Sequence, residues 1–429
     1  MSETNSQAGF QSNSQASSKA QSFDVLIVGG GIVGLSMAVS LSGSLADLGL
    51  QIAVIDAQDS VEDMAEALKP KAAPSYDARV SALTLASQSF LTGLGVWQDI
   101  KSVSACPYDE MFVWDGEGTG TIEFAAADIH ESRLGHIVEN KLVVAALNKA
   151  LLNCSNLTIF RPETVSSLDT SMSQLCLSSG LDINYKLLIG ADGGNSFIRR
   201  QADFKIKEWD YQHQALVTTV KTEKSHEFRA SQCFMKTGPL AFLPLLNSGS
   251  SQRSEQHYSS IVWSCVPERA EELMALDDEG FAGALGKAFE HKLGRIEKVE
   301  QRFCFPLWQR HARDYVQEGI ALVGDAAHTI HPLAGQGVNL GLLDVAVLSE
   351  VIAKACEREE DYSSEQVLSR YQRQRKGGNL SMMLLMEGFK RLFASDTLSI
   401  RWLRNLGLSS ADSIPSVKNY LMRKAMGLD

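Results

Sequence analysis

Residues 23–34 read FDVLIVGGGIVG, a short apolar run that ends in glycines. The run 24–28 predicts a buried strand, and the apolar spacing over 32–48 predicts a helix directly after it. Residues 51–56, QIAVID, predict a second strand, which completes a strand–helix–strand unit of a parallel sheet. The beginning of the chain therefore predicts a Rossmann-like nucleotide-binding domain.

The glycines of this stretch have the spacing of a dinucleotide-binding turn. In such a turn Gly29 permits the sharp bend, Gly31 lets the backbone approach a pyrophosphate, and Gly34 lets the helix pack on the strand. Asp56 closes the second strand 22 residues after Gly34, near the roughly 20 residues expected for an acid that binds a ribose. The alternative is a structural turn with a solvated Asp56. The combination of strand, glycines, helix, strand and acid makes that alternative the weaker one.

A second motif follows a third predicted strand. The apolar run 186–190 leads into ADGGNSFIRR at residues 191–200. Asp192 or Asn195 can cap a helix that begins here. The motif alone therefore does not distinguish a structural cap from a ligand-binding turn.

A third motif follows a fourth predicted strand at 319–323. It reads GDAAHT at residues 324–329 and continues as HPLAGQGVNLG at residues 331–341. The glycines of the continuation predict the start of a helix whose first amides have no partner within the helix. Such amides stabilise negative charge on a bound group. An irrelevant glycine-rich loop is the alternative, and the presence of three such motifs in order makes it a weak one.

The region between the second and third motifs has a different pattern of apolar and polar residues. Residues 214–222, 240–246 and 259–265 are rich in β-forming residues and predict an antiparallel sheet, to which 110–124 adds a hairpin. Residues 81–94 predict a helix. The predicted domains are a disordered tail over 1–22, a nucleotide-binding domain over 23–105, 136–205 and 300–370, a substrate domain over 106–135 and 206–299, and a helical C-terminal region over 371–429.

The composition excludes several classes of protein. At 429 residues the chain is long enough for two domains. The net charge of -11 argues against a nucleic-acid partner, because phosphate binding needs clustered positive charge. Seven cysteines without a Cys-x-x-Cys pair indicate reduced, mostly buried thiols, and we predict neither a metal site nor a disulfide. Neither a signal peptide nor a run of about 20 apolar residues is apparent, so we expect a cytoplasmic protein.

The charge of the chain reverses after Arg370. Residues 370–429 hold 11 Lys and Arg against 4 Asp and Glu, a net charge of +7 that leaves -18 on the rest. Five apolar residues of this segment share one helical face, namely Met382, Leu385, Met386, Phe389 and Phe393. A basic helix with an apolar face is drawn to anionic lipid. An ordinary packing helix and a docking surface for other enzymes are the alternatives.

Together with the three motifs, shorter strings establish a family resemblance. The chain resembles the group A flavoprotein monooxygenases of the para-hydroxybenzoate hydroxylase fold. The strings YDARVSAL at 76–83 and HPLAGQGVNLG at 331–341 narrow the resemblance to the ubiquinone-biosynthesis hydroxylases. HIVEN at 136–140 and WDYQH at 209–213 narrow it further, to members that act on a 2-polyprenylphenol. The resemblance covers roughly residues 23–428 and implies a mixed α/β fold, with a Rossmann-like FAD-binding domain and an inserted antiparallel-sheet substrate domain.

The resemblance implies roles for particular residues. Asp192 and Asp325 take the acidic positions of the family's two flavin motifs, and the Asp325 carboxylate is implied to bind the ribityl chain. Arg79 matches an arginine that contacts the flavin, although a surface ion pair is its alternative role, and Asn140 matches a Gln or Asn near the cofactor. The backbone around Pro332 is implied to lie beside the isoalloxazine, and no catalytic side chain is implied. The predicted cofactor-binding set is Gly29, Gly31, Gly34, Asp56, Arg79, Asn140, Asp192, Gly324, Asp325, Gly335, Gln336, Gly337 and Asn339.

The implied activity is FAD-dependent hydroxylation of a prenylated phenol in ubiquinone biosynthesis, with NAD(P)H as electron donor and O2 as co-substrate. In this family the reaction passes through a flavin C4a-hydroperoxide, for which the protein provides a dry pocket. The isoprenoid tail needs an apolar groove, which we expect along Leu240, Phe242, Leu243 and Leu245. Peripheral contact with the inner face of the membrane and with other ubiquinone-biosynthesis proteins is also expected.

The same residues are also compatible with three other functions. One is a different ring hydroxylase of the same pathway. Another is a flavin reductase or a prenyl-chain reductase on the same fold. The third is a non-catalytic FAD-binding subunit that holds a biosynthetic complex together.

Overall fold

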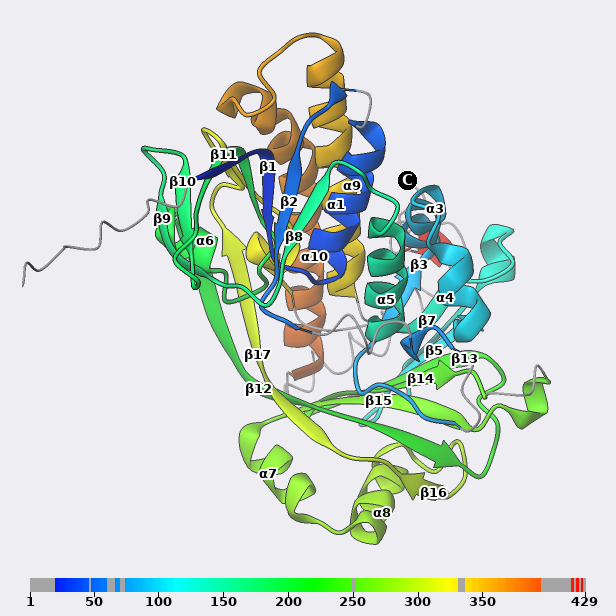
Figure 1. Cartoon of the computed structure of the whole chain (residues 1–429). Helices are drawn as coiled ribbons and strands as arrows, with labels where there is room; N and C mark the ends of the chain where they lie inside the picture. The colour runs from blue at the N-terminus through cyan, green and yellow to red at the C-terminus, as the bar shows by residue number, and fades with distance from the viewer. Residues whose placement is uncertain are drawn as a thin grey trace, which may run out of the picture.

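The fold is that of a computed structural model, and its strands form three sheets (Figure 1). The structure describes residues 20–45, 48–59, 66–69, 74–247, 252–330 and 336–394, together with 418, 419, 422, 423 and 426. Sheets and helices alternate in the first unit, and a largely antiparallel sheet dominates the second. The predicted mixed α/β class is confirmed.

The first sheet has the order β18-β19-β11-β1-β2-β8, and its central strands are parallel. Because these strands are covered on both faces, their residues are apolar almost without alternation. Helix α1 packs between α5 and α9, and α9 packs on α10. The strands are β1 (Gln21–Val28), β2 (Ile52–Ile55), β8 (Leu157–Phe160), β9 (Val165–Asp169), β10 (Gln174–Leu177), β11 (Asp182–Gly190), β18 (Val316–Gln317) and β19 (Ile320–Leu322). The helices are α1 (Ile32–Ser44), α5 (Asn140–Leu151), α6 (Phe197–Gln201), α9 (Gln336–Glu357) and α10 (Glu365–Ala394).

The second sheet has the order β20-β17-β12-β15-β14-β13-β5-β6, and two long strands, β12 and β17, connect it to the first unit (Figure 1). Its strands are β5 (Glu110–Asp115), β6 (Thr121–Ala125), β12 (Ile206–Thr222), β13 (Arg229–Met235), β14 (Gly238–Leu245), β15 (Tyr258–Cys265), β16 (Ile296–Val299), β17 (Phe303–Ala312) and β20 (His328–Thr329). Helices α7 (Pro267–Ala275) and α8 (Asp278–Ala288) cover its outer face. A third sheet joins β3 (Val80–Thr84), β7 (Gly135–Glu139) and β4 (Cys106–Tyr108), beside α3 (Leu85–Gly93) and α4 (Trp97–Val103).

The predicted helix over 81–94 is wrong in its first part. Ser81 and Leu83 pair with β7 and belong to strand β3. The helix begins only after Thr84, whose side-chain oxygen accepts the amide of Ser87 at 3.2 Å and so caps α3. The local sequence pattern therefore predicted too long a helix, because residues 80–84 form a strand only through their pairing with the distant strand β7.

The apolar groove predicted along β14 is also wrong. Leu240 and Phe242 belong to the core beneath α7 and α8, whereas Leu243 and Leu245 pack toward the third sheet. Successive side chains of a strand point to opposite faces, so the four cannot line one groove.

Other predictions differ in detail. Strand β1 begins at Gln21, slightly before the predicted Phe23, and residues 1–19 lie outside the described residues. Strand β17 pairs with β12 of the second sheet, although it falls in the range 300–370 that the sequence assigned to the nucleotide-binding domain.

The seven cysteines are free, three of them buried and four half-buried. Among the described helices, none combines the length and the apolar character needed to cross a bilayer.

Candidate functional site

The candidate site lies where four neighbouring parallel strands end. Val28 of β1 is in register with Ile55 of β2 and with Gly190 of β11, and Gly190 is in register with Leu322 of β19. The residues that follow these strands are the three glycine motifs and Asp56. Ligands of open α/β sheets bind outside the carboxyl ends of the strands. The structure therefore brings the separate sequence motifs together at the edge where a nucleotide is expected.

The three glycines of the first motif have different surroundings. A Cβ on Gly29 would lie 2.4 Å from the carbonyl oxygen of Ala191, and its φ is +115°, a conformation that favours glycine. A Cβ on Gly34 would lie 1.9 Å from the Gly29 oxygen. No described atom lies within 4 Å of a Cβ placed on Gly31. Gly29 and Gly34 thus allow the turn to pack, while Gly31 leaves its backbone open to a ligand.

Helix α1 begins directly at this open position. Its N-cap is Gly31, and no side chain caps the helix. The first amides of a helix lack partners within the helix and attract anions. The uncapped start of α1 therefore fits the pyrophosphate of FAD.

Asp56 is buried at the end of β2, with 8% of its surface exposed. Its Oδ2 atom lies 3.1 Å from Nε of Arg161, whose Nη1 donates to Oδ1 of Asn148 at 2.7 Å. The solvated alternative for Asp56 is therefore wrong. Gly30, which the sequence analysis did not single out, is required here, because a Cβ on it would lie 2.0 Å from Asp56 Oδ2. The run of three consecutive glycines was the available signal.

The N-cap of helix α6 is Ser196, whose hydroxyl accepts the Arg199 amide at 2.9 Å, and neither Asp192 nor Asn195 takes that position. Asp192 instead binds the first two amides of the helix. Its Oδ2 atom accepts the amides of Phe197 at 2.6 Å and Ile198 at 3.1 Å. Its Oδ1 atom is buried and has no hydrogen-bond partner among the described residues. A buried carboxylate oxygen without a donor is costly, so a bound group that donates a hydrogen bond fits this atom.

Asp325 follows Gly324, whose φ of +58° turns the chain sharply after β19. The Asp325 carboxylate is exposed, and the structure gives it no hydrogen-bond donor among the described residues. Desolvation by the surrounding protein raises the pKa of Asp325, and nearby His328 and Arg79 oppose that rise. A Cβ on Gly337, at the start of α9, would lie 3.9 Å from Asp325 Oδ1. The carboxylate and the helix start therefore border the same space.

Arg199 joins the second motif to the third. Its side chain is buried, and it donates to the carbonyl oxygens of Ala326 at 2.9 Å and Gly194 at 2.7 Å. The sequence analysis quoted this arginine at the end of the second motif without assigning it a role. The structure shows that it fixes the two ligand-side turns relative to each other.

A fully buried acid, Asp344 of α9, supports the turn from behind. Its Oδ2 atom accepts the Gly324 amide at 3.0 Å and lies 2.5 Å from Nε2 of His328. Its Oδ1 atom accepts Nε of Arg375 from α10 at 2.8 Å and Nδ2 of Asn379 at 3.3 Å. Burial alone would raise the pKa of Asp344, and His328 and Arg375 overcome this effect and hold the pKa below its ordinary value. The only sequence signal was an acid within the apolar helix GLLDVAVL at 341–348.

Arg79 and Asn140 lie together beside the third sheet. The Asn140 amide donates to the Arg79 carbonyl at 2.9 Å, and the Asn140 Oδ1 atom accepts the Ser81 hydroxyl at 2.7 Å. The exposed Arg79 guanidinium lies over the ring of Phe305, 5.5 Å from its centre. Its charge is also close enough to affect Asp325. Arg79 therefore connects the third motif with the second sheet.

Asn339 is placed differently from its predicted cofactor contact. Its buried side chain donates to Ala82 at 2.8 Å and accepts the Thr84 amide at 3.0 Å. These bonds tie α9 to strand β3, so a contact with FAD would come from the Asn339 backbone. The predictions for Pro332 and Gly335 lie outside the described residues, as does the side chain of Gln336.

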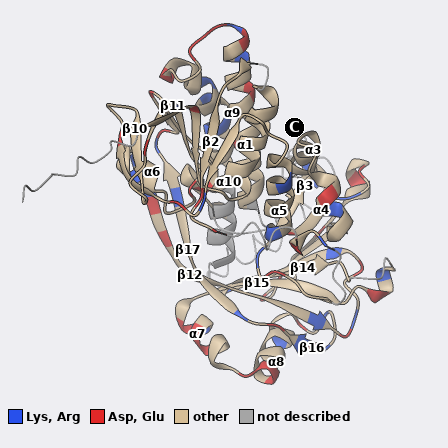
Figure 2. Cartoon of the chain, in the orientation of Figure 1, with Lys and Arg blue, Asp and Glu red and all other residues tan. Residues whose placement is uncertain are grey.

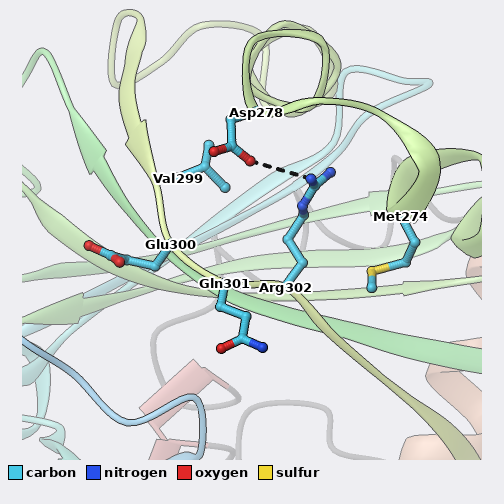
Figure 3. Close-up of a pocket in the computed structure, with 6 residues that line it drawn as sticks. All are labelled: Met274, Asp278, Val299, Glu300, Gln301 and Arg302. Atoms are coloured by element: carbon cyan, nitrogen blue, oxygen red, sulfur yellow. Dashed lines mark hydrogen bonds and ion pairs between the residues drawn. The ribbon is translucent and has the colours of Figure 1, made fainter.

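A surface hollow of about 320 Å³ lies elsewhere, between α7, α8 and the segment 299–302 that connects β16 to β17 (Figure 3). Arg302 reaches across it to Asp278 at 3.3 Å and also donates to the Leu273 carbonyl at 3.0 Å. None of the residues that line it belongs to the glycine motifs. The hollow is therefore separate from the candidate site.

Comparison with known proteins agrees with this geometry. A family model described as an FAD binding domain matches residues 137–379. The chain is 36% identical to the 3-demethoxyubiquinol 3-hydroxylase of Escherichia coli, across 95% of this chain and 99% of that protein. It is 33% identical to the mitochondrial ubiquinone biosynthesis monooxygenase COQ6 of Danio rerio, across 95% of this chain and 90% of that protein. The crystal structure of p-nitrophenol 4-monooxygenase from Pseudomonas putida has a TM-score of 0.73 at 18% identity, covering 95% of this chain and 99% of that one.

Proposed function

Because this chain belongs to the flavin monooxygenase family that includes the ubiquinone-pathway ring hydroxylases, we propose that it hydroxylates the aromatic ring of a 2-polyprenylphenol. The electron donor is NAD(P)H, and O2 supplies the oxygen atom. The observation that carries the proposal is the pairing of β17 of the second sheet with β20, which is formed by His328 and Thr329 of the third motif. Arg79 lies over Phe305 of the same strand β17. A ring held against the second sheet is thereby adjacent to the flavin motifs.

The residues of this chain bind and orient, and the bound FAD supplies the oxygen-activating chemistry. The amides of α1 and the open backbone at Gly31 hold the pyrophosphate, and Asp56 holds the adenosine ribose. Asp325 holds the ribityl chain. A phenol ring is already electron-rich, so no side chain is required as a general base. The protein positions the ring and keeps water away from it.

A second candidate is another ring hydroxylase of the same pathway. The similarity to a protein named 3-demethoxyubiquinol 3-hydroxylase favours it, because that similarity extends over nearly the whole of both chains. The two candidates differ in the ring that they accept. A 2-polyprenylphenol carries one oxygen, whereas a demethoxyubiquinol ring is more heavily substituted.

Product analysis tests the proposal. The purified, FAD-loaded protein should oxidise NADH or NADPH in the presence of 2-farnesylphenol and release a product heavier by one oxygen atom, which 18O2 labels. Turnover of a demethoxyubiquinol analogue alone would assign the protein to the second candidate. NAD(P)H oxidation that yields a product with two added hydrogen atoms and no added oxygen, in place of H2O2, would indicate a reductase on this fold. If neither NAD(P)H nor a ring reacts although FAD is bound, the protein is a non-catalytic FAD-binding subunit.

We also propose that the basic C-terminal region brings the protein to the membrane, where a prenylated substrate is dissolved. The end of the molecule formed by α7 and α8 is rich in Asp and Glu (Figure 2), including Glu268, Glu272 and Asp278. Anionic lipid repels such a surface, so approach through the C-terminal region is favoured. Of its predicted apolar face, Met382 is half-buried, and the side chains of Leu385, Met386, Phe389 and Phe393 lie outside the described residues.

The double variant Lys390→Glu and Arg391→Glu tests the membrane proposal. Each basic residue near an anionic surface contributes about 1 kcal/mol, so binding to phosphatidylglycerol vesicles should weaken by at least an order of magnitude and become less sensitive to salt. FAD affinity should not change. Reversal of Lys149 and Lys354, which are 57% and 54% exposed, is the matched control and should affect vesicle binding much less. Equal losses in the two variants would contradict a specific role of the C-terminal region.

A further inference from the structure

Alternate side chains of strand β17 share one face of the second sheet. The odd-numbered residues of β17 form a row that runs from His311 through Gln309 and Leu307 to Phe305 and Phe303. The Nε2 atom of His311 lies 3.0 Å from the hydroxyl of Tyr315. That tyrosine in turn accepts a hydrogen bond from Asn379, a partner of Asp344. One end of the row therefore contacts the network behind the Gly324–Asp325 turn.

The other end of the row is aromatic and lies on the same face as two valines. Phe303 is paired with Val217 across the β12–β17 ladder, and Val217 is paired with Val262 of β15. Directly paired residues project from the same face of a sheet. The alternate residue Cys304 packs on the opposite face, toward the core beneath α7 and α8. Phe303, Phe305, Val217 and Val262 therefore form one apolar wall on the side of the sheet that carries the Arg79 contact.

This wall is accessible in the folded protein. Phe305 is 37% exposed, and Phe303, Val217 and Val262 are half-buried. The two phenylalanine rings are nearly parallel, with centroids 6.5 Å apart and an interplanar angle of 10°. The Phe305 ring lies next to the Arg79 guanidinium. An accessible apolar surface beside a reaction site indicates contact with an apolar part of the substrate.

We propose that Phe303, Phe305, Val217 and Val262 form the wall that receives the isoprenoid part of the substrate, and so determine the preference for prenylated over unprenylated phenols. The inference rests on the proposed function. The hydroxylated ring lies at the Arg79 end of the wall, and the first isoprene units lie along the phenylalanine faces. One methylene in an apolar pocket changes discrimination by roughly 10- to 200-fold. A polar side chain in the part of the wall that contacts the tail should therefore weaken binding of the isoprenoid tail and leave hydroxylation of the ring unchanged.

The test compares 2-farnesylphenol with 2-methylphenol, which has the same ring without the tail. Phe303→Gln should raise KM for 2-farnesylphenol by about tenfold and change kcat and KM for 2-methylphenol by less than about twofold. Phe305→Gln, at the end of the wall where the ring lies beside Arg79, should raise KM for both phenols. Phe305→Leu should retain the preference, because it keeps an apolar surface. Val217→Thr, which keeps the shape of valine and adds a hydroxyl, provides a milder variant in case a glutamine prevents folding.

The matched control is Ile206→Gln on β12. Ile206 is 36% exposed, almost the same as Phe305, but it is paired with Ala312 of β17, which strand alternation places on the face opposite to Phe303 and Phe305. This variant should leave both substrates unaffected. Parallel losses for the two phenols in Phe303→Gln, or an unchanged preference in the folded Phe303→Gln variant, would overturn the inference.

Calorimetric binding of 2-farnesylphenol, without turnover, separates this inference from the proposed function. If the wild type binds the probe about tenfold more tightly than Phe303→Gln yet hydroxylates no phenol, the wall is supported and the proposed function fails. If the wild type hydroxylates both phenols and the variants bind the probe equally well, the function stands and the wall is refuted. FAD affinity, measured in parallel, shows whether loss of the Phe305 ring disturbs Arg79.

Discussion

Replacement of Asp344 by alanine is expected to lower the free energy of unfolding of the FAD-free protein by about 3–5 kcal/mol. The carboxylate is completely buried and is the shared partner of His328, Arg375 and the Gly324 amide. Removing it leaves the Arg375 cation without its counter-charge and the Gly324 amide without an acceptor. Removing one member of a buried network lowers the free energy of unfolding by far more than the intact pair contributes to it. The reason is that the remaining polar groups stay buried without a partner.

Urea unfolding of the FAD-free protein measures this loss. Asp99→Ala is the control, because Asp99 forms an ion pair of the same 2.8 Å length with Lys149 but is 36% exposed. Exposed pairs contribute at most about 1 kcal/mol. Asp344→Asn should give an intermediate loss, since its amide oxygen can still accept from Gly324. Similar unfolding midpoints for Asp344→Ala and Asp99→Ala would show that the network does not stabilise the fold.

The same carboxylate gives the stability a defined dependence on pH. The pKa of Asp344 is depressed in the folded protein, so its contribution is present above the unfolded value of about 3.9. It is lost as the pH falls through the folded value, where the native carboxylate takes up a proton. The stability difference between wild type and Asp344→Ala should therefore narrow below about pH 4. A difference that widens on acidification would contradict the ionised state of Asp344.

The sequence predicted the parts of the site that depend on local geometry. Gly29 lies in the turn after β1 and Gly34 in the first turn of α1, so their spacing is set within a few residues, and the contact of Asp192 with the start of α6 is also local. The network around Asp344 could not be predicted in this way. His328 precedes it by 16 residues and Arg375 follows it by 31, and the three meet only because α9 packs on α10 and on the turn after β19.

Pairing between strands that are distant in the sequence also explains why the predicted helix over 81–94 and the predicted groove along β14 were wrong. Residues 81–84 have a helical pattern, yet they pair with β7 more than 50 residues away. The leucines and phenylalanine of β14 were assigned to one groove because the strand register was unknown. The wall on β17 was missed for the same reason. Its phenylalanines are separated from Val217 and Val262 in the sequence and adjoin them only through the ladders of the second sheet.

Asp325→Ala should have the opposite signature to Asp344→Ala, although the two acids lie on either side of the same turn. The Asp325 side chain is exposed, and no hydrogen-bond donor contacts its carboxylate among the described residues. Its charge is therefore not stabilised by the folded protein alone. The FAD-free variant should be as stable as the wild type or slightly more stable. A ligand-binding side chain that has no hydrogen-bond partner in the ligand-free protein commonly lowers the free energy of unfolding of that form.

The loss in Asp325→Ala should instead appear in FAD binding. A hydrogen bond from the ribityl hydroxyl to a charged carboxylate contributes about 1.5–3 kcal/mol, and each factor of ten in affinity corresponds to about 1.4 kcal/mol. FAD affinity, measured from flavin fluorescence, should therefore fall by about one to two orders of magnitude. Asp314→Ala, which removes a 52% exposed acid paired with Lys376 at 3.3 Å, is the control and should leave FAD affinity unchanged. Unchanged affinity in a folded Asp325→Ala protein would remove Asp325 from the cofactor site, and lower stability of the FAD-free form would assign it a structural role like that of Asp344.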